Sequence, residues 1–319
     1  MSEDNVAESI KKSRPNISDN SVKLYERNLK KLQSMFDTDD YKFLKDIDKV
    51  KEKLDHLSSN TQRNYFNAII IYLMAIDSDK DLIKEYGDIR DELNQKYEDD
   101  NATGKISDKQ KDNFVDIKEI HKMLDEMADE IKGKKIKKKE DLKPKEKALL
   151  QVYTIFNIYT RLPMRNDVSG MEAISKREYN KLKEDEKKEK NYLVINKNNM
   201  FMVLNKYKTA KKYEENKIDI PKDLEKLLRV WIRINGMGVL FTTSTGNALS
   251  RNALSQLLIK TTKKYMGKSI STTMLRKIYL SSKYGDVQKE MEKDAKVMGH
   301  SKEVAQNIYI KEGQEESEE

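Results

Sequence analysis

Apolar residues in the first third of the chain repeat with the spacing of amphipathic helices. From residue 19 onward they recur at steps of three and four, so that they share one helical face. These positions are Val22, Tyr25, Leu29 and Leu32. Similar patterns predict further helices over 43–57, from Ser59, and over 79–97. We therefore predict a small helical domain at 19–97, preceded by a polar segment, 1–18, that we expect to be flexible.

A polar stretch then separates this domain from the rest of the chain. Residues 98–114 contain Gly104 and few apolar side chains, which is typical of a linker. The next segment, 115–310, begins with a patterned helix and a strongly apolar one. It continues with two apolar runs joined by three polar residues, the pattern of a β-hairpin. The predicted strands are 191–196, 200–205 and 217–221. Four more predicted helices follow, at 223–234, 250–266, 272–285 and 289–300. The expected fold is mainly α with a small antiparallel β-sheet.

Composition excludes several classes of function. The chain has no cysteine and three histidines, which excludes disulfide frameworks, thiolate zinc sites and cysteine nucleophiles. We expect no metal site and no cofactor. No run of apolar residues is long enough to cross a membrane, and the N-terminus lacks the apolar core of a secretory signal. We therefore expect an intracellular protein, located in the cytoplasm or in a host nucleus, without a membrane partner.

Charge is the first indication of a partner. The net charge is +8, and the acidic tail at 311–319 carries −4 of its own, so the rest of the chain is more basic still. A basic body is typical of proteins that bind nucleic acid. Residues 132–147 hold nine lysines against three acidic residues. This run is either a phosphate-contacting patch or a solvated loop. Its candidate DNA-binding residues are Lys134, Lys135, Lys137, Lys138 and Lys139.

The residues that carry chemistry are spread through the second segment in a particular order. Arg165 follows the strongly apolar helix, and Lys208 lies in the connection from the second predicted strand to the third. Arg276 comes next, then the pair Gly299–His300, and Tyr309 stands nine residues after that histidine. Any one of these features is more often structural than catalytic, but the ordered combination indicates a site.

This order resembles the tyrosine recombinase (phage integrase) family, across residues 115–310. The resemblance implies a tyrosine recombinase catalytic domain there and a helical SAM-like core-binding domain at 19–97. It also implies that the protein cleaves and rejoins DNA through a covalent 3′-phosphotyrosyl intermediate, without metal or nucleotide cofactor. Double-stranded DNA would be the partner, bound by a dimer to tetramer. The form of the first arginine box, PMRND, is more similar to recombinases of eukaryotic viruses and mobile elements.

The physical roles follow from the chemistry of phosphodiester cleavage. Tyr309 would attack the phosphorus and preserve the phosphoester for rejoining. Arg165 and Arg276 stay protonated and can grip the non-bridging oxygens with planar forks. His300 can donate to the phosphate or take the tyrosine proton, and Lys208 can protonate the leaving 5′-oxygen.

Several assignments have rivals, and one position departs from the family. Arg161 competes with Arg165 for the role of the first catalytic arginine. Asp167 is expected to orient Arg165. The rivals of Lys208 are Lys206, Lys211 and Lys212, which are also candidate DNA-binding residues. The other late tyrosines, Tyr265 and Tyr279, lie at apolar helical spacing and are expected in the core. Three residues before Arg276, where the family has histidine, stands Thr273. A hydroxyl can bind a phosphate oxygen but offers no positive charge.

Two other functions fit the same residues. A type IB topoisomerase would nick, swivel and reseal DNA with the same chemistry. A DNA-binding protein that kept the fold and lost catalysis is supported only by Thr273.

Overall fold

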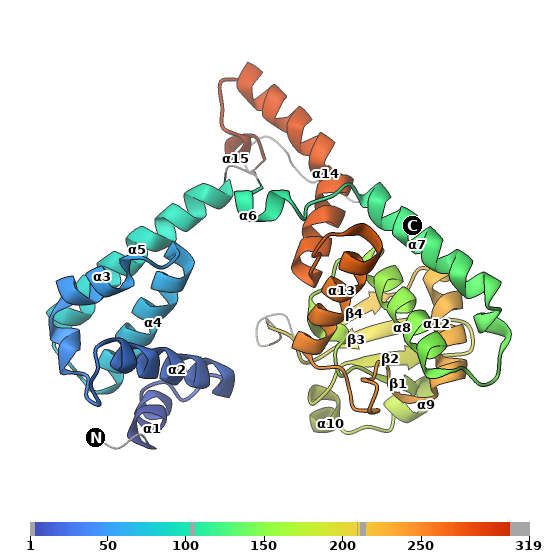
Figure 1. Cartoon of the computed structure of the whole chain (residues 1–319), viewed down its shortest axis with the longest axis horizontal. Helices are drawn as coiled ribbons and strands as arrows, with labels where there is room; N and C mark the ends of the chain where they lie inside the picture. Colours follow the sequence, from blue (N-terminus) through green and yellow to red (C-terminus); the bar gives the residue numbers. More distant parts are fainter. Residues whose placement is uncertain (1–3, 103–105, 209, 211–214, 307–319) are drawn as a thin grey trace, which may run out of the picture. The chain divides into compact units, whose positions relative to one another are not determined.

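The computed structural model describes residues 4–102, 106–208, 210 and 215–306. The chain divides into two compact units, Met1–Ile106 and Ser107–Glu319. Figure 1 labels most of the elements named below. The fold is mostly helical, as the sequence predicts.

The first unit is built around α4 (Ser59–Ala75), which is buried on nearly all sides. Its residues from Ala68 to Leu73 are all buried, which explains why this segment is apolar throughout rather than amphipathic. The other elements pack around it. They are α1 (Asp4–Ser13), α2 (Asp19–Met35), η1 (Lys42–Lys45), α3 (Ile47–Asp55) and α5 (Lys80–Ala102). The hydroxyl of the fully buried Tyr86 on α5 donates to the carbonyl of Leu44 at 2.9 Å and so joins α5 to η1.

The structure differs from the sequence prediction at both ends of this unit. Within the segment 1–18, residues Asp4–Ser13 form a helix that the sequence did not predict, because Val6 and Ile10 lie one helical turn apart and bury against α2 and α4. At the other end α5 continues to Ala102, into the stretch that we expected to be a linker. Its polar composition is compatible with a solvated helix, and α6 (Asp108–Lys111) also lies in that stretch.

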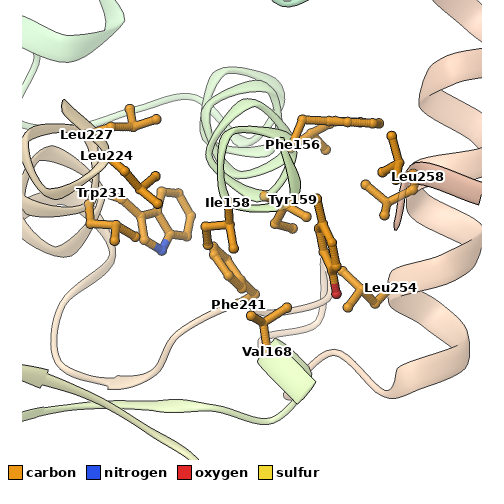
Figure 2. Close-up of a cluster of buried hydrophobic side chains, with 14 of the residues drawn as sticks. Phe156, Ile158, Tyr159, Val168, Leu224, Leu227, Trp231, Phe241, Leu254 and Leu258 are labelled. Carbon is orange, nitrogen blue, oxygen red and sulfur yellow. The ribbon is translucent and has the colours of Figure 1, made fainter. Parts of the chain in front are cut away.

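The second unit surrounds α8 (Pro144–Tyr159), which contributes Phe156, Ile158 and Tyr159 to its core (Figure 2). Helix α12 (Lys222–Asn235) packs on α8 through Leu224, Leu227 and Trp231. The indole N–H of the buried tryptophan donates to the carbonyl of Leu240 at 2.8 Å. Four further helices contribute to the same core as α8 and α12. They are α7 (Ile117–Gly133), η2 (Ile136–Lys138), α13 (Arg251–Met266) and α14 (Thr272–Val297).

The sheet of this unit has five strands in the order β4-β3-β2-β1-β5. The predicted hairpin is present, with Tyr192 opposite Val203, but the sheet is mixed rather than antiparallel because β1 runs parallel to β2. The segment between β1 and β2 holds two short helices, α9 (Lys176–Tyr179) and α10 (Glu184–Lys188), which make the crossover that parallel strands need. The strands are β1 (Glu172–Ser175), β2 (Tyr192–Ile195), β3 (Met200–Leu204), β4 (Asn216–Asp219) and β5 (Gly238–Val239).

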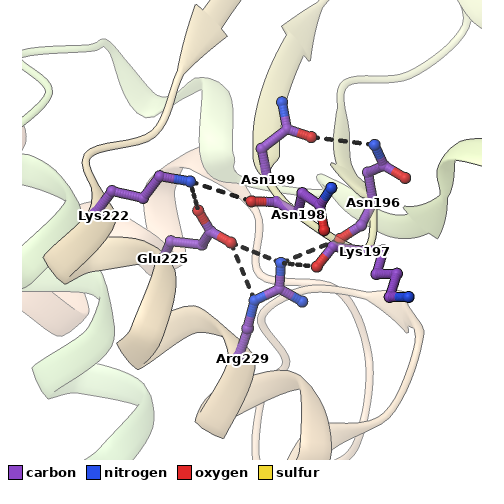
Figure 3. A network of polar contacts seen from close by, with 7 residues as sticks. All are labelled: Asn196, Lys197, Asn198, Asn199, Lys222, Glu225 and Arg229. Carbon is purple, nitrogen blue, oxygen red and sulfur yellow. Dashed lines mark hydrogen bonds and ion pairs between the residues drawn. The ribbon is translucent and has the colours of Figure 1, made fainter.

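A polar network fixes the turn between β2 and β3 (Figure 3). The buried carboxylate of Glu225 accepts from Arg229 Nε and Nη2 through one oxygen, at 3.0 and 2.6 Å. Arg229 Nη2 also donates to the carbonyl of Asn196 at 3.1 Å, and Lys222 Nζ donates to that of Asn198 at 3.1 Å. This anchors one end of β3, whose other end leads to the segment that contains Lys208.

Candidate active site

Arg165 and Arg276 line the same cavity. It has a volume of about 640 Å³ and lies between the segment that follows α8, the ends of β3 and β4, and the first turns of α14. The two arginines come from distant parts of the sequence, and the order of motifs predicted that they belong together. The remaining lining residues are Leu162, Pro163, Met164, Asp167, Leu204, Tyr207, Glu215, Asn216 and Ile218.

The position of Arg165 depends on how α8 ends. Pro163 follows the last turn of α8, and a proline disfavours helical geometry at the residue before it. The backbone is then extended at Arg165, with φ −71° and ψ −169°. The hydroxyl of Tyr159 donates to the carbonyl of Arg165 at 2.9 Å, and burial raises the pKa of this tyrosine. Tyr159 therefore acts as a neutral hydrogen-bond donor that holds the arginine backbone beside the cavity.

Asp167 is a buried carboxylate among arginines. Its Oδ1 accepts from Arg251 Nη2 at 3.1 Å, and its side chain is only 6% exposed. Burial raises its pKa, and the positive charges of Arg251, Arg165 and Arg276 act in the opposite direction. Asp167 thus links the two arginines of the cavity to the start of α13. The sequence predicted that Asp167 orients Arg165, whereas its contact with Arg251 was not predictable, because no local spacing connects residues so far apart.

Arg276 is partly buried, and its Nε has no hydrogen-bond partner among the described residues. Its Nη2 lies 3.5 Å from Thr273 Oγ1, one turn earlier on the same helix. A buried N–H without an acceptor is costly in a folded protein, which makes an oxygen-rich ligand a fitting partner. Thr273 is exposed on this turn and can contribute its hydroxyl.

Arg161 lies in a different environment from Arg165. Its Nε donates to Asp223 Oδ2 at 2.6 Å, and its Nη1 donates to Asn157 Oδ1 at 2.8 Å. Arg161 is thereby tied to α12 and α8 and is not among the residues that line the cavity. The contacts of Arg161 are those of a residue that joins two helices.

The predicted lysines differ in what they contact. Lys208 is exposed and directly follows Tyr207, which lines the cavity. Lys206 Nζ lies 3.6 Å from Glu189 Oε2, at the same end of the sheet. Lys211 and Lys212 lie outside the described residues, as do Tyr309 and the acidic tail at 311–319.

The lysine run after α7 is exposed and partly ion-paired. Lys134 Nζ lies 2.5 Å from Glu130 Oε1, and Lys139 Nζ lies 2.6 Å from Glu146 Oε1. Lys137 Nζ lies 5.4 Å from the ring centroid of Tyr153. Lys135 and Lys138 are also exposed, so all five candidate side chains reach solvent at least in part.

His300 follows the far end of α14. The sequence predicted two helices, 272–285 and 289–300, but α14 runs without interruption from Thr272 to Val297. Its end is a Schellman motif, in which Gly299 has φ +71° and the N–H of His300 donates to the carbonyl of Ala295 at 2.9 Å. At about 1.5 Å per residue, Arg276 and Val297 are separated by about 32 Å along the helix axis. Within one chain, the structure therefore does not bring His300 to the arginines.

The described residues contain neither a candidate metal site nor a membrane-spanning helix. Among the described residues, no three histidine, aspartate or glutamate side chains form a group that could hold a metal ion. No described helix combines the length and the apolar character that a membrane span requires.

Comparison with known proteins gave structural neighbours only. No protein-family model and no curated protein matches the sequence. The fold is similar to a crystal structure of XerA recombinase, with a TM-score of 0.34 and 11% identity over 98% of this chain and 95% of that one. It is also similar to XerH site-specific recombinase bound to difH substrate in a pre-cleavage complex. For that structure the TM-score is 0.47, with 17% identity over 98% of this chain and 81% of that one. A post-cleavage complex of XerH with palindromic difH substrate gives 0.47 and 17%, over 98% and 82%. All three of these structures are named as recombinases.

Proposed function

We propose that this chain is a site-specific DNA recombinase of the tyrosine recombinase type. It cleaves and rejoins DNA strands through a 3′-phosphotyrosyl intermediate formed by Tyr309. The observation that carries the proposal is the cavity shared by Arg165 and Arg276, where the buried Nε of Arg276 has no acceptor among the residues that the structure describes. Two permanent cations at one cavity are suited to a scissile phosphate and to the additional charge of its transition state.

The remaining residues have supporting roles in this proposal. Asp167 and Tyr159 hold the arginines in place, one through charge and one through the backbone of Arg165. Lys208 lies next to a residue of the cavity wall, from where its long side chain can protonate the leaving 5′-oxygen. Both units would contact the duplex, with the lysines after α7 on phosphates and the binding therefore dependent on salt.

The experiment is a covalent trapping assay. Nicked duplexes with a randomised site and a labelled 3′ strand are incubated with the full chain and separated on a denaturing gel. Wild type should form a labelled protein adduct, and Tyr309→Phe should form none. Tyr279→Phe is the matched control, because it removes the hydroxyl of another late tyrosine that has no proposed role. An adduct that persists in Tyr309→Phe would contradict the nucleophile assignment, and no adduct with wild type would favour a DNA-binding protein without catalysis.

A second assay separates recombination from topoisomerase activity. Adducted sequences recovered from the first assay are cloned into two labelled duplexes and into a supercoiled plasmid. A recombinase exchanges strands between the duplexes, whereas a type IB topoisomerase relaxes the plasmid and yields no exchanged product. Relaxation without exchange would therefore contradict the recombinase assignment and leave the phosphotyrosyl chemistry in place.

A further inference from the structure

Asn191 is a buried residue just before β2 whose side-chain amide uses all of its hydrogen-bonding capacity. It is only 6% exposed. Its Nδ2 donates to the carbonyl of Asp167 at 2.9 Å and to that of Lys206 at 3.2 Å. Its Oδ1 accepts from the backbone N–H groups of Asn205 at 3.0 Å and of Lys206 at 2.8 Å. An asparagine side chain offers two donors and two lone pairs, so all four positions are filled. Each of these contacts is to main chain, so Asn191 fixes the path of the backbone.

The contacts of Asn191 begin where the ladder of the β2–β3 hairpin ends. Strand β3 ends at Leu204, so Asn205 and Lys206 lie beyond it, and their N–H groups donate to a side chain instead of to a neighbouring strand. A buried amide is costly unless its hydrogen bonds are made. An apolar residue at position 191 would remove the acceptor of both N–H groups. The asparagine therefore extends the order of the hairpin by two residues.

The two backbone segments that Asn191 joins carry two of the proposed catalytic groups. Asp167 follows Arg165 by two residues, and Lys206 precedes Lys208 by two. Two residues of chain span at most about 7 Å, so the junction lies close to the backbone of both groups. The residues on either side of it belong to the wall of the arginine cavity, namely Asp167, Leu204 and Tyr207.

We propose that Asn191 is a positioning residue that sets the place of Lys208 relative to a phosphate bound by Arg165. It acts through the backbone at Asp167 and Lys206 and not by contact with the reacting atoms. This inference rests on the proposed function, in which Lys208 protonates the leaving 5′-oxygen. A general acid must lie within hydrogen-bond reach of the atom that it protonates. A displacement of about 1 Å can lower a rate by about 10²-fold, so a direct link between the two segments has a measurable effect.

Asn191→Asp breaks one side of this link and keeps the other. A carboxylate has nearly the same shape and can still accept from the N–H groups of Asn205 and Lys206. It has no N–H with which to bind the carbonyl of Asp167. The matched control is Asn198→Asp, which adds the same charge at an exposed position, at the far end of the hairpin.

The leaving group provides a readout that a purely structural role would not change. The duplexes carry the cleavage site recovered from the trapping assay, with either oxygen or sulfur at the scissile 5′ position. Sulfur leaves as a thiolate without a proton, whereas oxygen requires the general acid. Asn191→Asp should slow adduct formation at least tenfold with oxygen and less than about threefold with sulfur, while Asn198→Asp should match wild type with both. An equal loss with both duplexes would overturn the proposal.

A double variant tests whether Asn191 acts through Lys208. Lys208→Ala alone should show the same difference between the oxygen and sulfur duplexes. Adding Asn191→Asp to it should slow the oxygen reaction no further, because both changes affect the same proton transfer. Independent losses that multiply in the double variant would contradict the proposal.

A second variant is used if thermal melting shows that Asn191→Asp is unfolded at the assay temperature. Asn205 Nδ2 donates to the carbonyls of Lys187 and Lys190 at 2.8 and 3.2 Å and so holds the same junction from another side. Asn205 is only partly buried, so Asn205→Ala is the milder change. It should slow the oxygen reaction more than the sulfur reaction, and equal losses would again overturn the proposal.

Amide hydrogen exchange tests the junction without DNA. In Asn191→Ala the N–H groups of Asn205 and Lys206 lose their acceptor and should exchange at least tenfold faster, while those within β2 keep their rates. Unchanged exchange at these two residues would overturn the role of Asn191. If wild type forms no adduct, the proposed function fails, and the exchange result still decides whether Asn191 holds this backbone.

Discussion

Replacing Arg251 with alanine tests how far the buried carboxylate of Asp167 depends on this arginine, which no sequence motif indicated. The substitution removes the 3.1 Å hydrogen bond to Asp167, so less positive charge remains to offset the cost of burying its carboxylate. A hydrogen bond to a charged group contributes about 1.5–3 kcal/mol. Because 57% of the Arg251 side chain is exposed, solvent screens the pair, and we expect a loss of about 1.5 kcal/mol in the free energy of unfolding.

Urea unfolding measures this loss, and tryptophan fluorescence makes the measurement specific. The chain has one tryptophan, Trp231, which is buried in the core of the second unit. A double-mutant cycle with Asp167→Asn isolates the interaction. Arg251→Ala alone should be destabilised, whereas adding Asp167→Asn should recover about 1 kcal/mol, because no buried charge then remains. If the single and double variants unfold at the same urea concentration, the reasoning is refuted.

The pH dependence of Tm provides an independent check, because the charge of Asp167 fixes the direction in which the effect of Arg251→Ala must change with pH. Burial raises the pKa of Asp167, so the folded state holds its proton more tightly than the unfolded state, whose pKa is near 3.8. The arginines oppose this rise, so losing Arg251 raises the pKa further. The difference in Tm between wild type and Arg251→Ala should therefore be small at low pH and grow as the pH rises above that value. A difference that grows on acidification would contradict the charge argument.

Three further predictions follow from the geometry. Arg165→Ala should lower the rate of adduct formation, followed on denaturing gels, by about 10²-fold or more. Arg161→Ala should leave that rate within a few-fold of wild type but lower Tm, as thermal melting would show. Gly299→Ala should cost about 1 kcal/mol, because its φ of +71° is unfavourable for a residue with a Cβ atom, and helix content followed by circular dichroism would report it. Arg229→Ala should lower the free energy of unfolding by about 2 kcal/mol in urea, since it leaves a buried glutamate less compensated, while the exposed Lys226→Ala should change it little.

Elements with a long apolar period were predictable from the sequence, and elements set by tertiary pairing were not. The period from Val22 to Leu32 specified α2, because burial of one face determines that helix. Strand β5 has only two residues, Gly238 and Val239, too few for any alternation to be visible. The sequence prediction ended one helix at Gly285 and began another at 289, but α14 is continuous, because a single glycine costs a helix only about 1 kcal/mol, which its neighbours can offset.

The residues of the candidate site also fall into two groups, those that sequence motifs predicted and those that only the fold brings together. Arg165 and Arg276 could be placed together because each lies in a short motif of recognisable order. Arg251 could not, since only the fold brings it to Asp167. The location of His300 depends on whether α14 continues past Gly285, which is decided by the balance between helix propagation and packing rather than by any local signal.

The network at the β2–β3 turn reduces the number of positive charges that the chain has available for phosphate contacts. Lys222 and Arg229 add two charges to the net value of +8, but both point at backbone carbonyls and at Glu225. Arg161 is engaged in a similar way with Asp223. If DNA is the partner, as proposed, cations held like this would displace few counterions from it. The salt dependence of binding should accordingly report a smaller number of phosphate contacts than the composition alone would indicate.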